Sequence, residues 1–88
     1  MKVEVTKSFE KDIRKIKDKK LAKKLSDLIN ELEVSKTIVD IPNLKKMVAP
    51  GSYYRIRVGQ FRLGLKIERN IVVLLCFMDR KEIYKYFP

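Results

Sequence analysis

The stretch that decides the fold is Tyr53–Met78, which reads YYRIRVGQFRLGLKIERNIVVLLCFM. Two dipeptides, Gly59-Gln60 and Arg69-Asn70, divide it into runs at residues 53–58, 61–68 and 71–78. Apolar and polar side chains alternate in the first two runs, as they do in strands with one buried face. The third run is apolar on both faces, which predicts a strand in the middle of the sheet. The stretch therefore predicts consecutive antiparallel strands.

The loop Gly59-Gln60 determines how the first two strands pair. Glycine at its first position suits a two-residue type II′ hairpin turn. A loop of this length predicts the register Val58 with Phe61, Arg57 with Arg62, Ile56 with Leu63 and Arg55 with Gly64. Apolar residues then meet apolar residues on one face, while the opposite face carries Tyr53, Arg55, Arg57, Arg62 and Lys66, with Lys66 facing Tyr53.

The second of these faces has the composition of a phosphate-binding surface. Arg57 beside Arg62 places like charges opposite each other, which destabilises a sheet by up to about 1 kcal/mol. Gly64 is expected to leave room beside Arg55 for a ligand or a long side chain. Guanidinium groups match phosphate oxygens in a bidentate manner. The alternative is that the arginines only solubilise the sheet.

The rest of the chain predicts an α+β fold, with an N-terminal strand and an α-helical hairpin packed on a twisted antiparallel sheet. Val3 and Val5 indicate a first strand with one buried face, and Ser8 is the expected cap of a first helix, with Glu10 and Asp12 in its first turn. Leucines at helical spacing predict a second helix over residues 19–33. A short strand is expected at 44–48. The tail 79–88 is expected to form a short turn or helix that lays Ile83, Tyr84 and Phe87 against the body.

The charge points to a polyanionic partner. The chain has 88 residues, enough for a single domain over 1–88, and a net charge of +10. Residues 1–44 hold eleven Lys/Arg and eight Asp/Glu (+3), whereas residues 45–88 hold ten and three (+7). Nucleic acid or an acidic protein would match this excess. Lys45 and Lys46 either extend the basic track or are ordinary loop lysines.

The composition also excludes several kinds of site. Cys76 is the single cysteine, so no intrachain disulfide and no cysteine metal cluster can form. Cys76 is interpreted as a small buried hydrophobe, since the chain has no histidine to activate it. No metal and no cofactor are expected. The N-terminus lacks the apolar segment of a secretory signal, and the apolar run 71–78 is too short to span a bilayer. We therefore expect a cytoplasmic protein without membrane contact.

The segment YYRIRVGQFRLGLK, followed by the apolar strand and DRKEIYKYFP, resembles the RelE/ParE superfamily of toxins from toxin–antitoxin systems, in particular its RelE-like branch. The resemblance implies an endoribonuclease, a translation inhibitor that cuts mRNA in the ribosomal decoding site and is held inactive by an acidic antitoxin. Residues carried over from the family's catalytic positions are Arg55, Arg57, Arg62, Arg80 and Tyr84. Lys45, Lys46, Tyr53, Lys66 and Lys81 are the expected RNA-binding residues.

The sequence departs from the family pattern where a proton acceptor is needed. Relatives often have lysines where this chain has Arg55 and Arg57, and a histidine where it has Asp79. Arginine stays protonated, so it stabilises a phosphorane but is a poor general base. Asp79 is a candidate acid or base, or else a turn cap. Two alternatives stay open: a ParE-like inhibitor of DNA gyrase that is no enzyme, and an inactive module that binds RNA or antitoxin.

Overall fold

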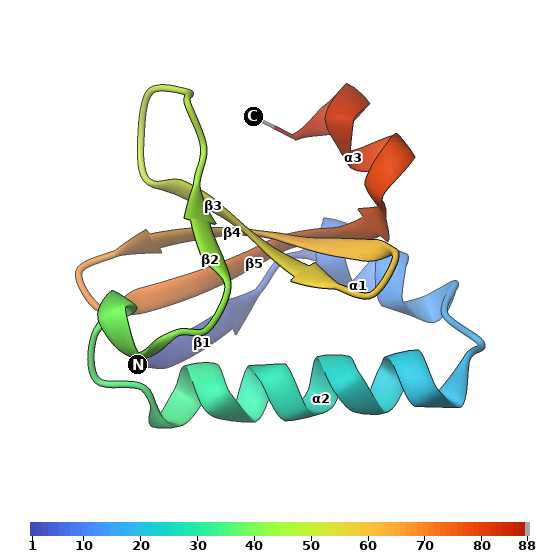
Figure 1. Cartoon of the computed structure of the whole chain (residues 1–88), viewed down its shortest axis with the longest axis horizontal. Helices are drawn as coiled ribbons and strands as arrows, with labels where there is room; N and C mark the ends of the chain where they lie inside the picture. Colours follow the sequence, from blue (N-terminus) through green and yellow to red (C-terminus); the bar gives the residue numbers. More distant parts are fainter. Residues whose placement is uncertain (88) are drawn as a thin grey trace.

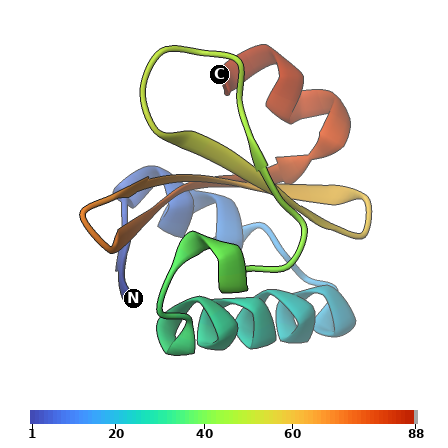
Figure 2. The same cartoon turned by 60° about the vertical axis from the view of Figure 1, so that its left-hand side comes forward.

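The computed structural model describes residues 1–87 and shows an α+β fold with one five-stranded sheet in the order β1-β5-β4-β3-β2. Helices α1 and α2 cover one face of the sheet, and α3 lies on the other (Figures 1 and 2). Along the chain the elements are β1 (Lys2–Val5), α1 (Lys7–Arg14), α2 (Lys19–Val34), a 3-10 turn η1 (Ile38–Asp40), β2 (Leu44–Lys46), β3 (Tyr53–Val58), β4 (Phe61–Glu68), β5 (Ile71–Asp79) and α3 (Arg80–Tyr86).

The predicted hairpins are confirmed. Strands β3 and β4 have the expected bounds, and β5 extends one residue past its prediction. The backbone φ at Gly59 is +60°, which a type II′ turn requires at its first loop residue. Arg69 and Asn70 both have positive φ, as in a type I′ turn. Strand β5 lies inside the sheet between β1 and β4, and β4 takes the central position.

The expected antiparallel sheet is confirmed for β2 to β5, and the N-terminal strand joins it in parallel, so the whole sheet is mixed. Strand β1 pairs with β5 in parallel, with Val3 beside Val72. The other three pairings are antiparallel. Parallel neighbours need a long crossover connection, and here α1, α2 and the β2–β4 meander all lie between the two strands in sequence. Alternation within β1 carries no information about its direction.

The main core lies between the sheet and the two N-terminal helices. Leu25, Leu28 and Leu32 of α2 are buried, as the helical stripe predicted. They pack with a cluster from α1 and the sheet whose other members are Phe9, Ile41, Ile56, Val58, Leu63, Leu65, Ile67, Val72, Leu74 and Phe77. Burial of this apolar surface is the main force that holds the helices on the sheet. Among the described residues no helix is long and apolar enough to cross a membrane.

Several local expectations for the first 48 residues were wrong. Thr6, not Ser8, caps α1, because its side-chain oxygen accepts from the backbone N–H of Phe9. Val5 is 51% exposed, since β1 lies at the edge of the sheet. Asp12 lies beyond the first turn of α1 and is buried against β5. Strand β2 ends at Lys46 rather than Val48.

A second, smaller apolar cluster lies beneath α3. The β4–β5 register shifts between Gly64 and Leu65, so Gly64 pairs with Cys76 and Leu65 with Leu74. This irregularity places one extra residue, Leu75, in β5 and changes the alternation. Cys76 is buried next to Gly64, on the sheet face opposite the main core. The prediction that Cys76 is a buried hydrophobe is confirmed, and burial raises the pKa of its thiol to about 11.

Candidate RNA-binding surface

The predicted register brings the arginines of the sheet together. Arg57 pairs with Arg62, and Arg55 pairs with Gly64. Side chains of directly paired residues lie on the same face of a sheet, so these arginines share the face that carries α3. We call the group formed by Arg55, Arg57 and Arg62, with Arg80 and Tyr84 of α3, the arginine surface.

Helix α3 is anchored on the sheet, and this places Tyr84 in the arginine surface. Ile83 is 1% exposed, and the ring of Phe87 meets Tyr53 edge-on with centroids 6.0 Å apart. With that side of the helix buried, Tyr84 stays 64% exposed. The guanidinium carbon of Arg55 lies 5.2 Å from the centre of the Tyr84 ring, within cation–π range. Tyr84 therefore belongs to the arginine surface and does not pack into the body.

Arg62 connects the arginine surface to the β3–β4 turn. Its Nη1 donates to the carbonyl oxygens of Gly59 and Phe61, at 3.0 and 2.9 Å. Desolvation lowers the pKa of the Arg62 guanidinium, and the positive charge of Arg57 lowers it further. The other three members also act on this pKa: Tyr84 raises it, while Arg55 and Arg80 lower it. The other four members are thus close enough to Arg62 to affect its guanidinium.

In the described part of the chain, the four guanidinium groups form no ion pair with an acidic side chain. Within residues 1–87 every side-chain ion pair uses a lysine, and none uses Arg55, Arg57, Arg62 or Arg80. Like charges that face each other without a counter-ion repel. A bound anion would remove that repulsion, and phosphate fits guanidinium geometry. The charge and geometry of these groups therefore suit the binding of a polyanion.

The flanking residues divide into those that adjoin the arginine surface and those that do not. Lys45 pairs with Arg55 across β2 and β3, so it extends the surface. Lys46 pairs with Tyr54 and projects to the opposite face, which corrects its expected place in the track. Lys66 lies 5.9 Å from the Tyr53 ring. Its ammonium pairs with Glu68 at 2.9 Å, and this hydrogen bond raises the pKa of Lys66. Lys81 is exposed on α3.

Asp79 acts as a helix cap in this structure. Its Oδ1 accepts from the backbone N–H of Lys81 at 2.9 Å, which satisfies a free donor in the first turn of α3. No ion pair joins Asp79 to the neighbouring Arg80 in the described part of the chain. The geometry agrees with the turn-cap interpretation, and Asp79 fixes where α3, and with it Arg80, begins.

Gly64 does not leave open space beside Arg55. A Cβ atom there would lie 2.6 Å from the Cys76 sulfur and 2.8 Å from the Phe87 ring. The long side chain that crosses the sheet at this point is thus Phe87 itself. Gly64 thus leaves the space that Phe87 occupies at the end of α3, and in the docked helix Tyr84 lies against Arg55.

Asp12 is a buried charged residue whose burial the sequence did not reveal. It is 8% exposed, and its Oδ2 accepts from the backbone N–H of Phe77 at 2.9 Å. Sixty-five positions separate the two residues, so no local pattern predicts the contact. The described residues contain no group of three acidic or cysteine side chains that could hold a metal ion.

Comparisons with known proteins give one consistent result. The family model for the ParE toxin of the type II toxin–antitoxin system parDE matches residues 3–84. Toxin RelE3 of Methanocaldococcus jannaschii is 34% identical over the whole of both chains. Among solved structures, the RelB–RelE antitoxin–toxin complex from Methanococcus jannaschii matches with a TM-score of 0.82 and 29% identity, over 97% of this chain and 99% of that one.

More distant structures share the fold. A chain of the archaeal RelE–RelB complex from Pyrococcus horikoshii matches with a TM-score of 0.72 at 18% identity, over 90% of this chain and 93% of that one. The resemblance inferred from the segment 53–88 is therefore confirmed over nearly the whole chain. The protein belongs to the RelE/ParE superfamily of toxins from type II toxin–antitoxin systems.

Proposed function

We propose that this protein is an mRNA endoribonuclease that binds its substrate on the arginine surface. The observation that carries the proposal is the set of four guanidinium groups that share one face without an acidic partner in the described chain. The similarity to Toxin RelE3 over the full length supports the same class of activity. The expected reaction is attack of a ribose 2′-OH on the adjacent phosphate.

The arginine surface supplies electrostatic stabilisation of that reaction. Negative charge builds on the phosphate oxygens as the 2′ oxygen attacks, and preformed cationic donors stabilise it without reorganisation. Arg57 and Arg62 are paired across the strands and can hold the phosphate between them. Tyr84 lies against Arg55 with its ring exposed, so it is available to stack on a base or to orient the nucleophile.

Proton transfer is the weaker part of this chemistry. Arginine does not accept a proton at ordinary pH, and Asp79 already accepts a hydrogen bond as the cap of α3. We therefore propose that the ribosome supplies much of the catalysis by holding the mRNA in attack geometry. Cleavage of free RNA should then be much slower than cleavage of ribosome-bound message.

Toeprinting on programmed ribosomes tests the proposal. Wild-type protein should cut the message, and Arg57→Gln should slow cleavage about 100-fold, the scale for loss of one transition-state donor. Arg69→Gln is the matched control, because Arg69 lies in the β4–β5 turn and outside the arginine surface. Intact message at equal concentrations of protein and ribosomes would refute the nuclease.

Inhibition of DNA gyrase is the second candidate, since the matching family model describes the ParE toxin. A supercoiling assay separates the two functions. Inhibition of purified gyrase together with intact mRNA would favour the ParE-like activity.

We further propose an acidic antitoxin as the partner. The net charge of +10 favours such a protein. The related M. jannaschii structure is itself an antitoxin–toxin complex. Co-expression with an acidic neighbouring gene product should suppress toxicity and yield a stable complex.

A further inference from the structure

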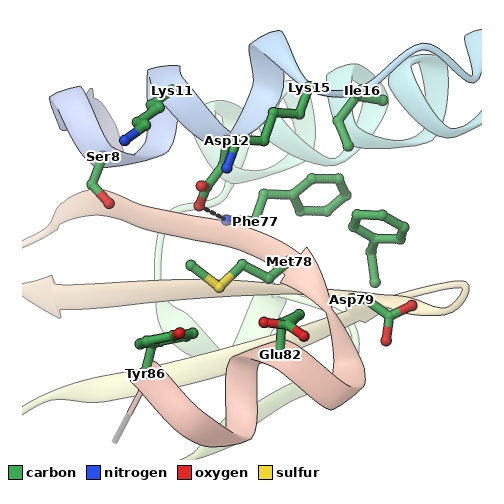
Figure 3. Close-up of a pocket in the computed structure, with 11 residues that line it drawn as sticks. Ser8, Lys11, Asp12, Lys15, Ile16, Phe77, Met78, Asp79, Glu82 and Tyr86 are labelled. Atoms are coloured by element: carbon green, nitrogen blue, oxygen red, sulfur yellow. Dashed lines mark hydrogen bonds between the residues drawn. The ribbon is translucent and has the colours of Figure 1, made fainter.

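A pocket of about 530 Å³ lies next to the arginine surface but outside it, between α1, the end of β5 and α3 (Figure 3). Strand β1 ends opposite Leu74, so no strand pairs with that edge of β5 beyond this point. The pocket lies along this open edge. Two of its lining residues, Phe61 and Asp79, directly precede Arg62 and Arg80 in the chain. The pocket therefore adjoins the arginine surface along the chain at two points.

The pocket has a buried hydrogen-bond acceptor in its wall. Figure 3 shows the Asp12 carboxylate between α1 and β5, with one oxygen bonded to the Phe77 amide at 2.9 Å. No hydrogen bond within the described residues uses its other oxygen. Every side-chain oxygen in this part of the chain that is fully shielded from solvent has a hydrogen-bond partner, so this Asp12 oxygen must be accessible from the pocket. The second oxygen is therefore free to accept from a ligand. An ionised carboxylate accepts only, so that ligand must present a donor.

Flat apolar groups form another part of the pocket. The rings of Phe61 and Phe77 stack with centroids 5.1 Å apart, and Met78, Ile16 and Tyr86 complete the apolar lining. Figure 3 shows Phe77 on the α1 side of the pocket and Tyr86 on the opposite, α3 side. A planar ligand can lie against such groups, as bases do on aromatic platforms.

Lysines form the rim nearest α1. Lys11 of α1 and Lys15, the residue that caps the end of this helix, are four positions apart, with Asp12 between them in the chain. Both are exposed, and neither forms an ion pair within residues 1–87. They are placed to bind an anionic group at the mouth of the pocket.

We propose that this pocket binds one nucleotide of the RNA, with a base that carries an exocyclic amino group. The amino group donates to the free oxygen of Asp12, the base lies on the apolar lining, and the phosphate lies against Lys11 and Lys15. This inference rests on the proposed RNA-cleaving function and adds base selection to it. Adenine, guanine and cytosine have such an amino group, whereas the one donor on the uracil base, its ring N3–H, lies between two carbonyl oxygens that repel a carboxylate.

The mixture of charges favours a nucleotide over a protein segment. An acidic segment would meet the carboxylates of Asp12, Asp79 and Glu82 in the pocket. A basic segment would be repelled by a protein of net charge +10. A nucleotide is anionic at its phosphate and has donors at its base, so it matches both the rim and the wall.

The test uses the amide resonances of the full-length protein titrated with AMP, CMP, GMP and UMP. The Phe77 amide reports on Asp12, to which it is bonded. AMP, CMP and GMP should shift the resonances of Phe77, Lys11 and Lys15. UMP should bind about tenfold more weakly, the scale of one lost hydrogen bond to a charged group.

Two substitutions separate base selection from phosphate binding. Asp12→Asn keeps an oxygen for the Phe77 N–H but replaces the free acceptor with a donor. AMP, CMP and GMP should then no longer bind more tightly than UMP. Lys15→Gln should weaken all four nucleotides about threefold, as expected for an exposed charge. Lys20→Gln on α2, also exposed and not a lining residue, is the matched control and should change nothing.

The outcomes distinguish this inference from the proposed function. Equal shifts from all four nucleotides, or shifts confined to the arginine surface, would overturn the base pocket and leave the nuclease intact. Absence of mRNA cleavage with the predicted nucleotide preference would overturn the nuclease alone. A pocket that instead responds to an acidic peptide, and not to nucleotides, would show a protein-binding site and also refute the inference.

Discussion

Gly64→Ala tests whether the docking of α3 builds the arginine surface. The added methyl group would lie 2.6 Å from the Cys76 sulfur and 2.8 Å from the Phe87 ring. Contacts this short force neighbouring side chains to move, and overpacking of this kind costs about 1–3 kcal/mol. For a domain of this size that cost lowers Tm by roughly 5–20 °C. The movement should also release Tyr84 from Arg55.

Thermal unfolding by circular dichroism measures the loss of stability, and toeprinting measures the loss of cleavage. Gly59→Ala is the matched control: a Cβ atom there meets nothing within 4 Å, so only the positive φ of +60° is penalised, at about 1 kcal/mol. Cleavage by that variant should be unchanged at temperatures below its Tm.

A double mutant locates the clash. If the Phe87 ring is one of the groups displaced, Gly64→Ala should cost about 1 kcal/mol less in a Phe87→Ala background than in the wild type. A Gly64→Ala protein that melts within about 2 °C of the wild type and cleaves mRNA normally would refute the role of this glycine.

Three further predictions follow from the same surface. Arg57→Gln should raise the free energy of unfolding by up to about 1 kcal/mol, because it removes the repulsion with Arg62; urea denaturation measures the gain while cleavage falls. Tyr84→Phe should keep the ring near Arg55 and most of the cleavage activity. Tyr84→Ala should lower the free energy of unfolding by about 0.5–1 kcal/mol and cleave mRNA more slowly. Equal cleavage rates for both variants would argue against a role for the ring. The pKa of the Cys76 thiol is raised from 9.0 to about 11, so its contribution to stability is present below pH 9.0 and is lost as pH rises through about 11. In unfolding measured as a function of pH, Cys76→Ala should show a smaller fall in the free energy of unfolding over this range.

The segment 53–78 shows how far sequence reasoning reaches. Alternation assigned the faces of β3 and β4, and the length of the loop Gly59-Gln60 determined their register, because a two-residue loop permits one pairing. Arg57 beside Arg62 was therefore predictable. At Gly64 the same reasoning left a ligand and a long side chain open, and only the structure shows that the space holds Phe87, from more than twenty positions away.

Long-range placement accounts for the other differences. The parallel pairing of β1, the displacement of Lys46 from the arginine surface and the burial of Asp12 against Phe77 all depend on which elements meet in space. Asp12 within KDIRK has the appearance of a solvated helix residue. Only the open edge of β5 creates the unsatisfied N–H that it bonds.

For this protein the sequence alone determined the strands, their hairpins, the leucine stripe of α2 and the cationic character of one sheet face. These features depend on residue spacing and on turns of two residues, which are local. The tertiary structure decided how α3 docks, which lysines join the arginine surface and where the pocket beside it lies. Those features depend on side chains from distant elements that compete for the same space, and no pattern within one segment encodes the outcome of that competition.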